Sequence, residues 1–209
     1  MKQWTKPAAL VCLLTLISCS SADKGEAYII AAPVPLAFAQ QNTCFLDGVK
    51  LAEEDIQSMD LPVSLQVQVD DDNADFSTAI ALAQKYISNP SIIGVVGHWY
   101  SDICLPISEL YKKGEKTLIV PTVSISALTN PPSDYLFRNI PDDSQIARKM
   151  CDYAVNGGVK TAVIYYEDST YGFRMSAGLE LYANSAGIDI ADRVCNPSMT
   201  RDLPDLLHK

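Results

Sequence analysis

The pattern that most constrains this chain is a regular alternation between short β-branched runs and amphipathic helical segments, clearest in residues 92–123. There a run of Ile, Gly and Val ends at Gly97, and a polar, aromatic turn follows. An amphipathic stretch then leads to a second apolar run that stops at Pro121. Strand, loop, helix and strand in this order form the repeating unit of a parallel α/β sheet. The alternation runs from Tyr28 to the end of the chain, so the sequence predicts a doubly wound α/β fold with parallel sheets.

The individual elements follow from hydrophobic periodicity and from the turn residues between them. We expect strands at residues 28–32, 63–69, 92–96, 117–120, 135–139, 160–166 and 188–194. We expect helices at residues 45–58, 75–88, 101–113, 142–155 and 173–185, and the start of another at 203–207. The alternating pattern of residues 63–69 is typical of a half-exposed or edge strand. Pro33 and Pro35 are expected to end the first strand, because proline has no N–H to donate.

The first residues have the pattern of an export signal and not of a folded element. Two lysines precede an apolar segment, residues 8–17, that is too short to cross a bilayer as a mature helix. Small residues then lead to Cys19, in an order that looks like a bacterial lipobox. We therefore expect a signal peptide at residues 1–18, lipidation of Cys19 and a polar tether at residues 19–27. The alternative is an ordinary secretory peptide that carries an incidental cysteine.

Composition and charge narrow the classes of function. Of the 209 residues, 48% are hydrophobic and 20% are charged, so the chain can bury a core. The net charge of −9 argues against binding nucleic acid, or an anionic membrane, through a basic face. Four cysteines follow the lipobox, with no Cys-x-x-Cys pair typical of zinc or redox sites, and we interpret all four as core or surface thiols. They are Cys44, Cys104, Cys151 and Cys195.

Two loops at the carboxyl ends of predicted strands carry the hydroxyl groups of most interest. Ser101 follows the strand at residues 92–96, and Thr122 and Ser124 follow the strand at residues 117–120. Ligands of open α/β sheets bind in the crevice beyond such strand ends. Ser101 also stands where a strand becomes a helix. Its position fits a contact to a ligand carboxylate at the helix N-terminus and fits a purely structural N-cap equally well.

Other candidate sites are weaker. Trp99 and Tyr100 either line an apolar pocket or pack between strand and helix, and packing is the favoured interpretation. The acidic run at residues 70–72 suggests a cation site, but a solvated loop that caps the next helix is favoured. His98 lacks a spaced partner for a metal, and its neighbours on one loop do not make a triad, so we expect an ordinary polar loop residue. The chain has no nucleophile elbow, dinucleotide loop or Walker loop, which argues against the common α/β enzymes.

Three stretches resemble type I periplasmic substrate-binding proteins of the leucine/isoleucine/valine-binding family. Residues 92–129 carry a Val-Gly run before a Ser-containing turn and a Ser- and Pro-rich second loop. Residues 135–154 begin YLFRN and continue to an Asp-Ser-Gln helix start, and residues 160–180 contain a Tyr-Gly turn. The resemblance extends from residue 28 to the end of the chain and is most specific in the middle.

That resemblance implies two α/β lobes that close on a small amino acid of the branched-chain type, or a related amide, and deliver it to the permease of an ABC transporter. It implies no enzymatic activity, no cofactor and no metal. Family members are longer, so we expect a first lobe at residues 28–140 and a partial second lobe at residues 141–209. With its lipid anchor the protein would lie in the cell envelope, facing the periplasm or the exterior. The alternative is a non-transport envelope lipoprotein that uses this fold for regulatory or protein–protein contacts.

The resemblance also assigns roles to individual residues. Ser101 matches the first-loop Ser that holds the ligand carboxylate, and Ser124 matches the second-loop Thr that contacts carboxylate and ammonium. Thr122 matches the residue whose backbone carbonyl accepts a hydrogen bond from the ammonium. Tyr171 matches a second-lobe Tyr that faces the cleft. Together with Tyr100, these are the expected ligand-binding residues.

Overall fold

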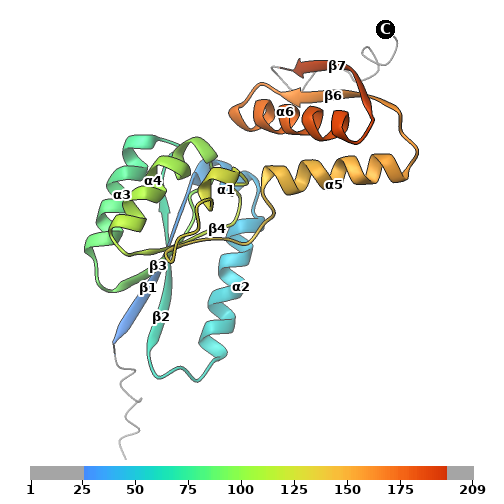
Figure 1. Cartoon of the computed structure of the whole chain (residues 1–209). Helices are drawn as coiled ribbons and strands as arrows, with labels where there is room; N and C mark the ends of the chain where they lie inside the picture. The colour runs from blue at the N-terminus through green and yellow to red at the C-terminus, as the bar shows by residue number, and fades with distance from the viewer. Residues whose placement is uncertain (1–25, 197–209) are drawn as a thin grey trace, which may run out of the picture.

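The computed structural model describes residues 26–196, and it describes the side chains of residues 26–195. These residues form two α/β units, which lie next to each other in Figure 1. The predicted lipidation site Cys19 and the helix expected at residues 203–207 lie outside the described residues. Within the described part of the chain, no helix is long and apolar enough to cross a membrane.

The first unit is a five-stranded, fully parallel sheet in the order β2-β1-β3-β4-β5. Its strands are β1 (Ala27–Val34), β2 (Ser64–Asp71), β3 (Ile92–Val96), β4 (Thr117–Val120) and β5 (Leu136–Arg138). Its helices are α1 (Leu36–Gln41), α2 (Cys44–Ser58), α3 (Phe76–Ser88) and α4 (Ser101–Lys113), with a 3-10 turn, η1 (Ser126–Leu128). The predicted α/β class is confirmed, and β2 is an edge strand as its alternating sequence indicated.

The second unit is smaller. Two parallel strands, β6 (Thr161–Glu167) and β7 (Asp189–Asn196), pair with each other. They are accompanied by α5 (Asp143–Asn156) and α6 (Thr170–Ser185), which pack against one another. In Figure 1, α5 starts beside the first unit and runs out beneath α6. A short connection therefore joins β5, the last strand of the first unit, to α5.

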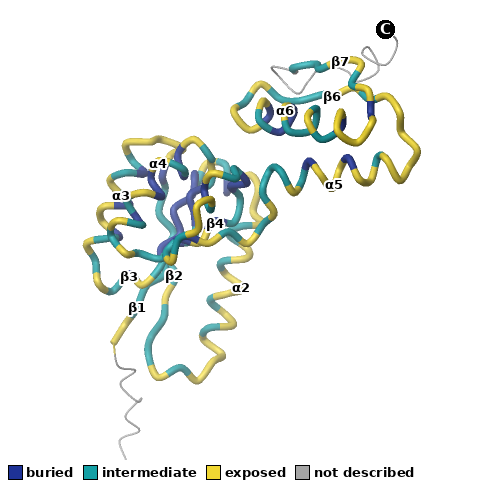
Figure 2. The backbone as a smooth tube through the Cα atoms, viewed as in Figure 1, coloured by how far each residue is buried: buried dark blue, intermediate teal, exposed yellow. Residues whose placement is uncertain are grey.

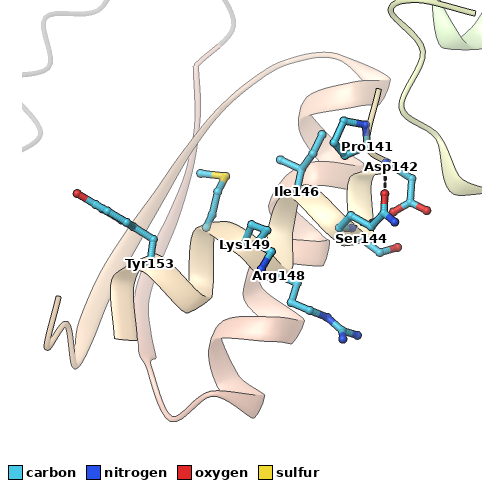
Figure 3. Close-up of a pocket in the computed structure, with 9 residues that line it drawn as sticks. Pro141, Asp142, Ser144, Ile146, Arg148, Lys149 and Tyr153 are labelled. Atoms are coloured by element: carbon cyan, nitrogen blue, oxygen red, sulfur yellow. Dashed lines mark hydrogen bonds between the residues drawn. The ribbon is translucent and has the colours of Figure 1, made fainter. Parts of the chain in front are cut away.

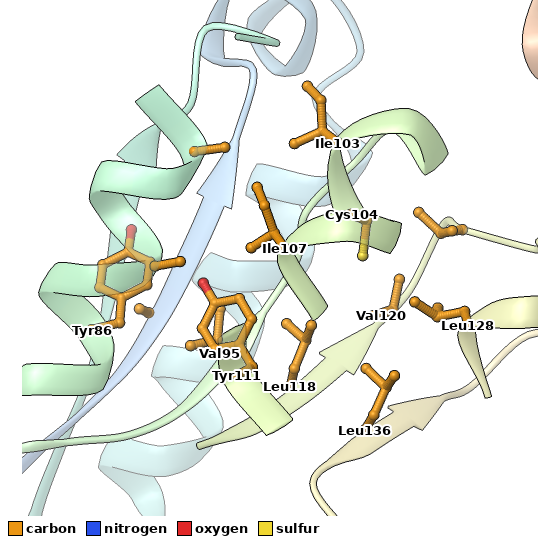
Figure 4. Close-up of a cluster of buried hydrophobic side chains, with 14 of the residues drawn as sticks. Tyr86, Val95, Ile103, Cys104, Ile107, Tyr111, Leu118, Val120, Leu128 and Leu136 are labelled. Carbon is orange, nitrogen blue, oxygen red and sulfur yellow. The ribbon is translucent and has the colours of Figure 1, made fainter. Parts of the chain in front are cut away.

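The larger buried core lies in the first unit, between the sheet and the helices α3 and α4 (Figure 4). Ile103, Ile107 and Tyr111 are spaced four residues apart, so they share the face of α4 that meets the sheet. Val95 and Leu118, from the neighbouring strands β3 and β4, are fully buried below them. Burying large apolar side chains in this way contributes about 1.5–3 kcal/mol each.

Two local details differ from the prediction. The first strand was expected to stop at residue 32, but β1 continues past Pro33 through Val34 alongside β2 and ends directly before Pro35. The pairing of β1 with β3 already ends at Ala31, so the missing N–H of Pro33 costs no ladder hydrogen bond. The helix α1 was not predicted at all. It begins after Pro35, whose carbonyl accepts hydrogen bonds from the backbone N–H groups of the first turn.

Candidate functional site

A cavity of about 310 Å³ lies where loops of the two units face each other. Its walls come from the β3–α4 and β4 loops of the first unit and from the β6–α6 loop of the second. The volume is at the lower end of the range for ligand pockets, which suits a small ligand. The lining residues are Trp99, Tyr100, Ser101, Asp102, Thr122, Glu167, Ser169, Thr170 and Tyr171.

The structure brings most of the predicted site residues to this one cavity. The cavity is lined by Tyr100, Ser101 and Thr122 from the first unit and by Tyr171 from the second. Ser124 is not among the lining residues. Its side chain is buried, and its backbone carbonyl accepts a hydrogen bond from the N–H of Asp143 at 2.8 Å. Ser124 therefore ties the second loop to the start of α5, and its ligand contact stays a prediction.

Ser101 is the first residue of α4 and not its N-cap. The N-cap is Tyr100, which has extended backbone geometry and whose carbonyl accepts the hydrogen bond from the N–H of Cys104 at 2.8 Å. Of the two roles that the sequence allowed for Ser101, the structural N-cap therefore belongs to Tyr100 instead. The consequence is that the Ser101 hydroxyl is not used in capping. The first N–H groups of a helix lack intrahelical partners and favour negative charge, so this end of α4 suits a carboxylate.

Thr122 connects the two loops of the first unit. Its hydroxyl donates a hydrogen bond to the backbone carbonyl of Trp99 at 2.9 Å. The Trp99 ring packs against Phe38 and Phe45, with ring centroids 5.4 and 5.7 Å apart. Tyr100 also approaches Phe38, at 6.5 Å. The aromatic residues of this turn therefore do both things that the sequence allowed, because they pack on α1 and α2 and also line the cavity.

The wall from the second unit is organised by Ser169, the N-cap of α6. Its hydroxyl accepts a hydrogen bond from the N–H of Gly172 at 2.9 Å and donates one to Glu167 at 2.6 Å. A Cβ at Gly172 would lie 2.1 Å from the Glu167 carbonyl oxygen, so the close approach of α6 to β6 requires glycine. Next to it, burial and the neighbouring Asp143 and Glu167 carboxylates raise the pKa of Tyr171, which stays a neutral phenol.

A buried polar cluster behind the first-unit wall was missed by the sequence analysis. His98, which was expected to be an ordinary loop residue, is fully buried. Its Nδ1 lies 3.0 Å from Asp72 and its Nε2 lies 3.1 Å from the hydroxyl of Tyr111. Asp72 is likewise buried, so the prediction of a solvated acidic loop is wrong. No local signal could show this pairing, because Asp72 and His98 come from different strand ends that only the sheet brings together.

A second, larger hollow of about 930 Å³ runs along α5 (Figure 3). All of its lining residues come from one continuous stretch, residues 141–153. Its apolar members Met150 and Tyr153 are 52% and 83% exposed. Ligand sites usually combine apolar walls with polar groups that converge from separate segments. The cavity between the units has that property and the α5 surface does not, so the cavity is the better candidate site.

Sequence comparisons relate this chain to known binding proteins. Residues 37–209 match the family model described as periplasmic binding protein. An amino acid binding protein of Pseudomonas aeruginosa is 30% identical over 120 residues, which cover 56% of this chain and 32% of that protein. A leucine-, isoleucine-, valine-, threonine- and alanine-binding protein of the same organism is 26% identical over 167 residues, which cover 78% of this chain and 44% of that protein.

Solved structures give the same relationship. An ABC transporter substrate-binding protein from Desulfitobacterium hafniense, in complex with Leu, is 31% identical with a TM-score of 0.73. The match covers 88% of this chain and 53% of that one, so the chain spans about half the length of this relative. A solute-binding protein from Rhodopseudomonas palustris, at 20% identity and a TM-score of 0.73, shares the fold. This chain belongs to the periplasmic binding protein family, whose members are substrate-binding proteins and not enzymes.

Proposed function

We propose that this chain is the substrate-binding component of an ABC importer and that it binds a small amino acid of the branched-chain type, or a related amide. The observation that carries the proposal is the convergence of Ser101, Thr122 and Tyr171, from three separate loops, on one small cavity. The relatives support the ligand class, because one is a leucine-, isoleucine-, valine-, threonine- and alanine-binding protein and another holds Leu.

The cavity offers a partner for each part of such a ligand. The carboxylate fits at the N-terminus of α4, where the Ser101 hydroxyl and backbone N–H groups can donate to it. The ammonium fits near the carboxylates of Asp102 and Glu167 and the backbone carbonyl of Thr122. Aromatic rings of Trp99, Tyr100 and Tyr171 supply apolar surface for the side chain.

Lobe boundaries, location and partners belong to the same proposal. The first lobe comprises residues 28–140 and the second begins at residue 141. Lipidation at Cys19 holds the protein on a membrane in the cell envelope, facing the periplasm or the exterior. From there it delivers the ligand to an ABC-transporter permease.

Calorimetry of the full chain with leucine, isoleucine, valine, threonine, alanine and their amides tests the ligand class. At least one is expected to bind, and Ser101→Ala should then weaken binding by about 1–3 kcal/mol, the cost of removing a hydrogen bond to a charged group. Because Tyr100 is the N-cap, the same substitution should change the free energy of unfolding by less than about 1 kcal/mol.

The matched control is Ser58→Ala. Its hydroxyl donates to a carbonyl at the exposed end of α2, away from the cavity, so binding should not change. A folded chain that binds none of the panel would refute the proposed ligand class.

A further inference from the structure

We propose that Arg174 is a ligand-binding residue that reaches the ligand carboxylate from the second unit, opposite Ser101. The inference rests on the proposed function, and it adds the residue that decides the preference of the site for an acid over an amide.

Arg174 lies on the face of α6 that points to the first unit. It follows Tyr171 by three residues, so the two side chains are neighbours on one helix face, and Tyr171 lines the cavity. One terminal nitrogen of the Arg174 guanidinium lies 3.5 Å from the Ser101 hydroxyl, across the boundary between the units. This places a positive charge next to the hydroxyl that is best positioned to hold a carboxylate.

A second contact, made by the Nε of Arg174, fixes the orientation of the guanidinium. Its Nε donates to the Asp143 carboxylate at 3.2 Å, and the two side chains are 26% and 14% exposed. Asp143 is itself anchored, since its backbone N–H donates to the Ser124 carbonyl. A guanidinium has five N–H donors. The two contacts found among the described residues use two of them, which leaves donors for a ligand that enters beside Ser101.

The charge of the cavity gives this arginine a specific role. The described lining residues include two carboxylates, Asp102 and Glu167, and no lysine or arginine. Both repel a ligand carboxylate, and a cation beside Ser101 would offset that repulsion in addition to the N–H groups at the start of α4. Arg174 supplies that cation, and guanidinium–carboxylate hydrogen bonds are both short and strong. Because Ser101 and Arg174 come from different units, a carboxylate held by both would also draw the units together.

A purely structural arginine is the competing explanation, because Arg174 also forms an ion pair within the second unit. The two explanations differ in ligand dependence. A structural role would weaken all ligands alike, whereas a carboxylate contact would matter for leucine and much less for leucinamide, which has no negative charge.

The test is calorimetry of the full chain with leucine and leucinamide, comparing the wild type, Arg174→Gln, Arg174→Lys and Arg193→Gln. Arg174→Gln should raise the Kd for leucine about tenfold or more and change that for leucinamide by less than about threefold. Arg174→Lys keeps the positive charge but loses the planar guanidinium with its paired N–H donors. Its Kd for leucine should therefore lie between those of the wild type and Arg174→Gln. Arg193 is the matched control, because it pairs with Glu180 and Ser176, two residues of the second unit that do not line the cavity.

The double variant Ser101→Ala/Arg174→Gln should lose less leucine affinity than the two single losses combined, since both side chains act on one carboxylate. Equal weakening of leucine and leucinamide by Arg174→Gln, or unchanged leucine binding, overturns the role of Arg174 and leaves the proposed function intact. A folded wild type that binds neither ligand nor any other member of the amino-acid panel refutes both.

Discussion

The two units of this chain differ in how much they bury. In the first unit, Tyr86, Ile107 and Leu118 are fully buried in one extended core between the sheet and two helices. In the second, the buried cluster among the described residues is formed by only Cys151 and Ala183 together with Ile188. Figure 2 shows the same contrast, with the buried positions concentrated in the strands and helices of the first unit. The cavity therefore has one firmly supported wall and one weakly supported wall.

This asymmetry has a consequence for binding. Segments with few buried apolar contacts open at a lower free-energy cost than a well-packed core. Tyr171 and Arg174 belong to the weakly supported unit, whereas Ser101 and Thr122 belong to the firmly supported one. We therefore expect a ligand that contacts both walls to protect the second unit more than the first.

The largest expected effect comes from truncating the first core. Leu118→Ala should lower the free energy of unfolding of the first unit by about 2–5 kcal/mol, because Leu118 is completely buried. Ile164→Ala, on β6 of the second unit, should cost less and should leave the first unit unchanged. Urea unfolding followed by Trp99 fluorescence reports the first unit, and circular dichroism reports both. Identical shifts of both signals for both variants would show that the two units unfold as a single cooperative unit.

The next effect is on cysteine reactivity. Cys104 lies in the core of the first unit and Cys151 in the small cluster of the second, with exposures of 0% and 6%. Burial raises the pKa of both thiols, to about 12 for Cys104. In variants in which Cys104 or Cys151 is the only cysteine, Cys104 should react with a thiol reagent at least about tenfold more slowly than Cys151. Equal rates under native conditions would mean that both clusters open together.

Alkaline pH should lower the free energy of unfolding of the first unit by a smaller amount. The folded protein keeps the Cys104 thiol protonated up to about pH 12, whereas an unfolded thiol loses its proton near 9.0. The stabilisation is therefore complete below pH 9 and is lost as the pH rises toward 12, by about 1 kcal/mol at pH 10. Burial raises the pKa of Tyr86 and Tyr111 in the same direction. Urea unfolding at pH 8 and pH 10 measures the loss, and Cys104→Ala should remove the thiol's share.

The smallest effects come from the helix caps. Asp75 caps α3 by accepting from the N–H of Thr78 at 2.7 Å, and Ser169 caps α6. Asp75→Ala and Ser169→Ala should each cost about 1 kcal/mol. Hydrogen exchange should show faster exchange confined to α6 for Ser169→Ala, whereas Asp75→Ala should affect the whole first unit. Exchange that spreads over both units in either variant would contradict independent units.

Parts of the site could be predicted because their signals are local. Ser101 and Thr122 follow apolar runs that end at glycine and proline, and such strand ends form the ligand crevice of a parallel sheet. The burial of His98 could not be predicted, because its two partners come from the loop after β2 and from α4, and no local pattern links them. The start of α4 at Ser101 was predicted correctly, but Tyr100 and not Ser101 is its N-cap, and a tyrosine gives no sequence signal for that position.

Hydrophobic period and turn chemistry act over short distances, so the sequence alone indicated the main strands and helices, the parallel α/β class and the strand ends that carry Ser101 and Thr122. Which strand ends face each other depends on tertiary packing. It set Tyr171 across the cavity from Ser101 and brought Arg174 to the Ser101 hydroxyl over a separation of 73 residues. Such contacts depend on strand order and on how the two units pack, and no local sequence pattern specifies either.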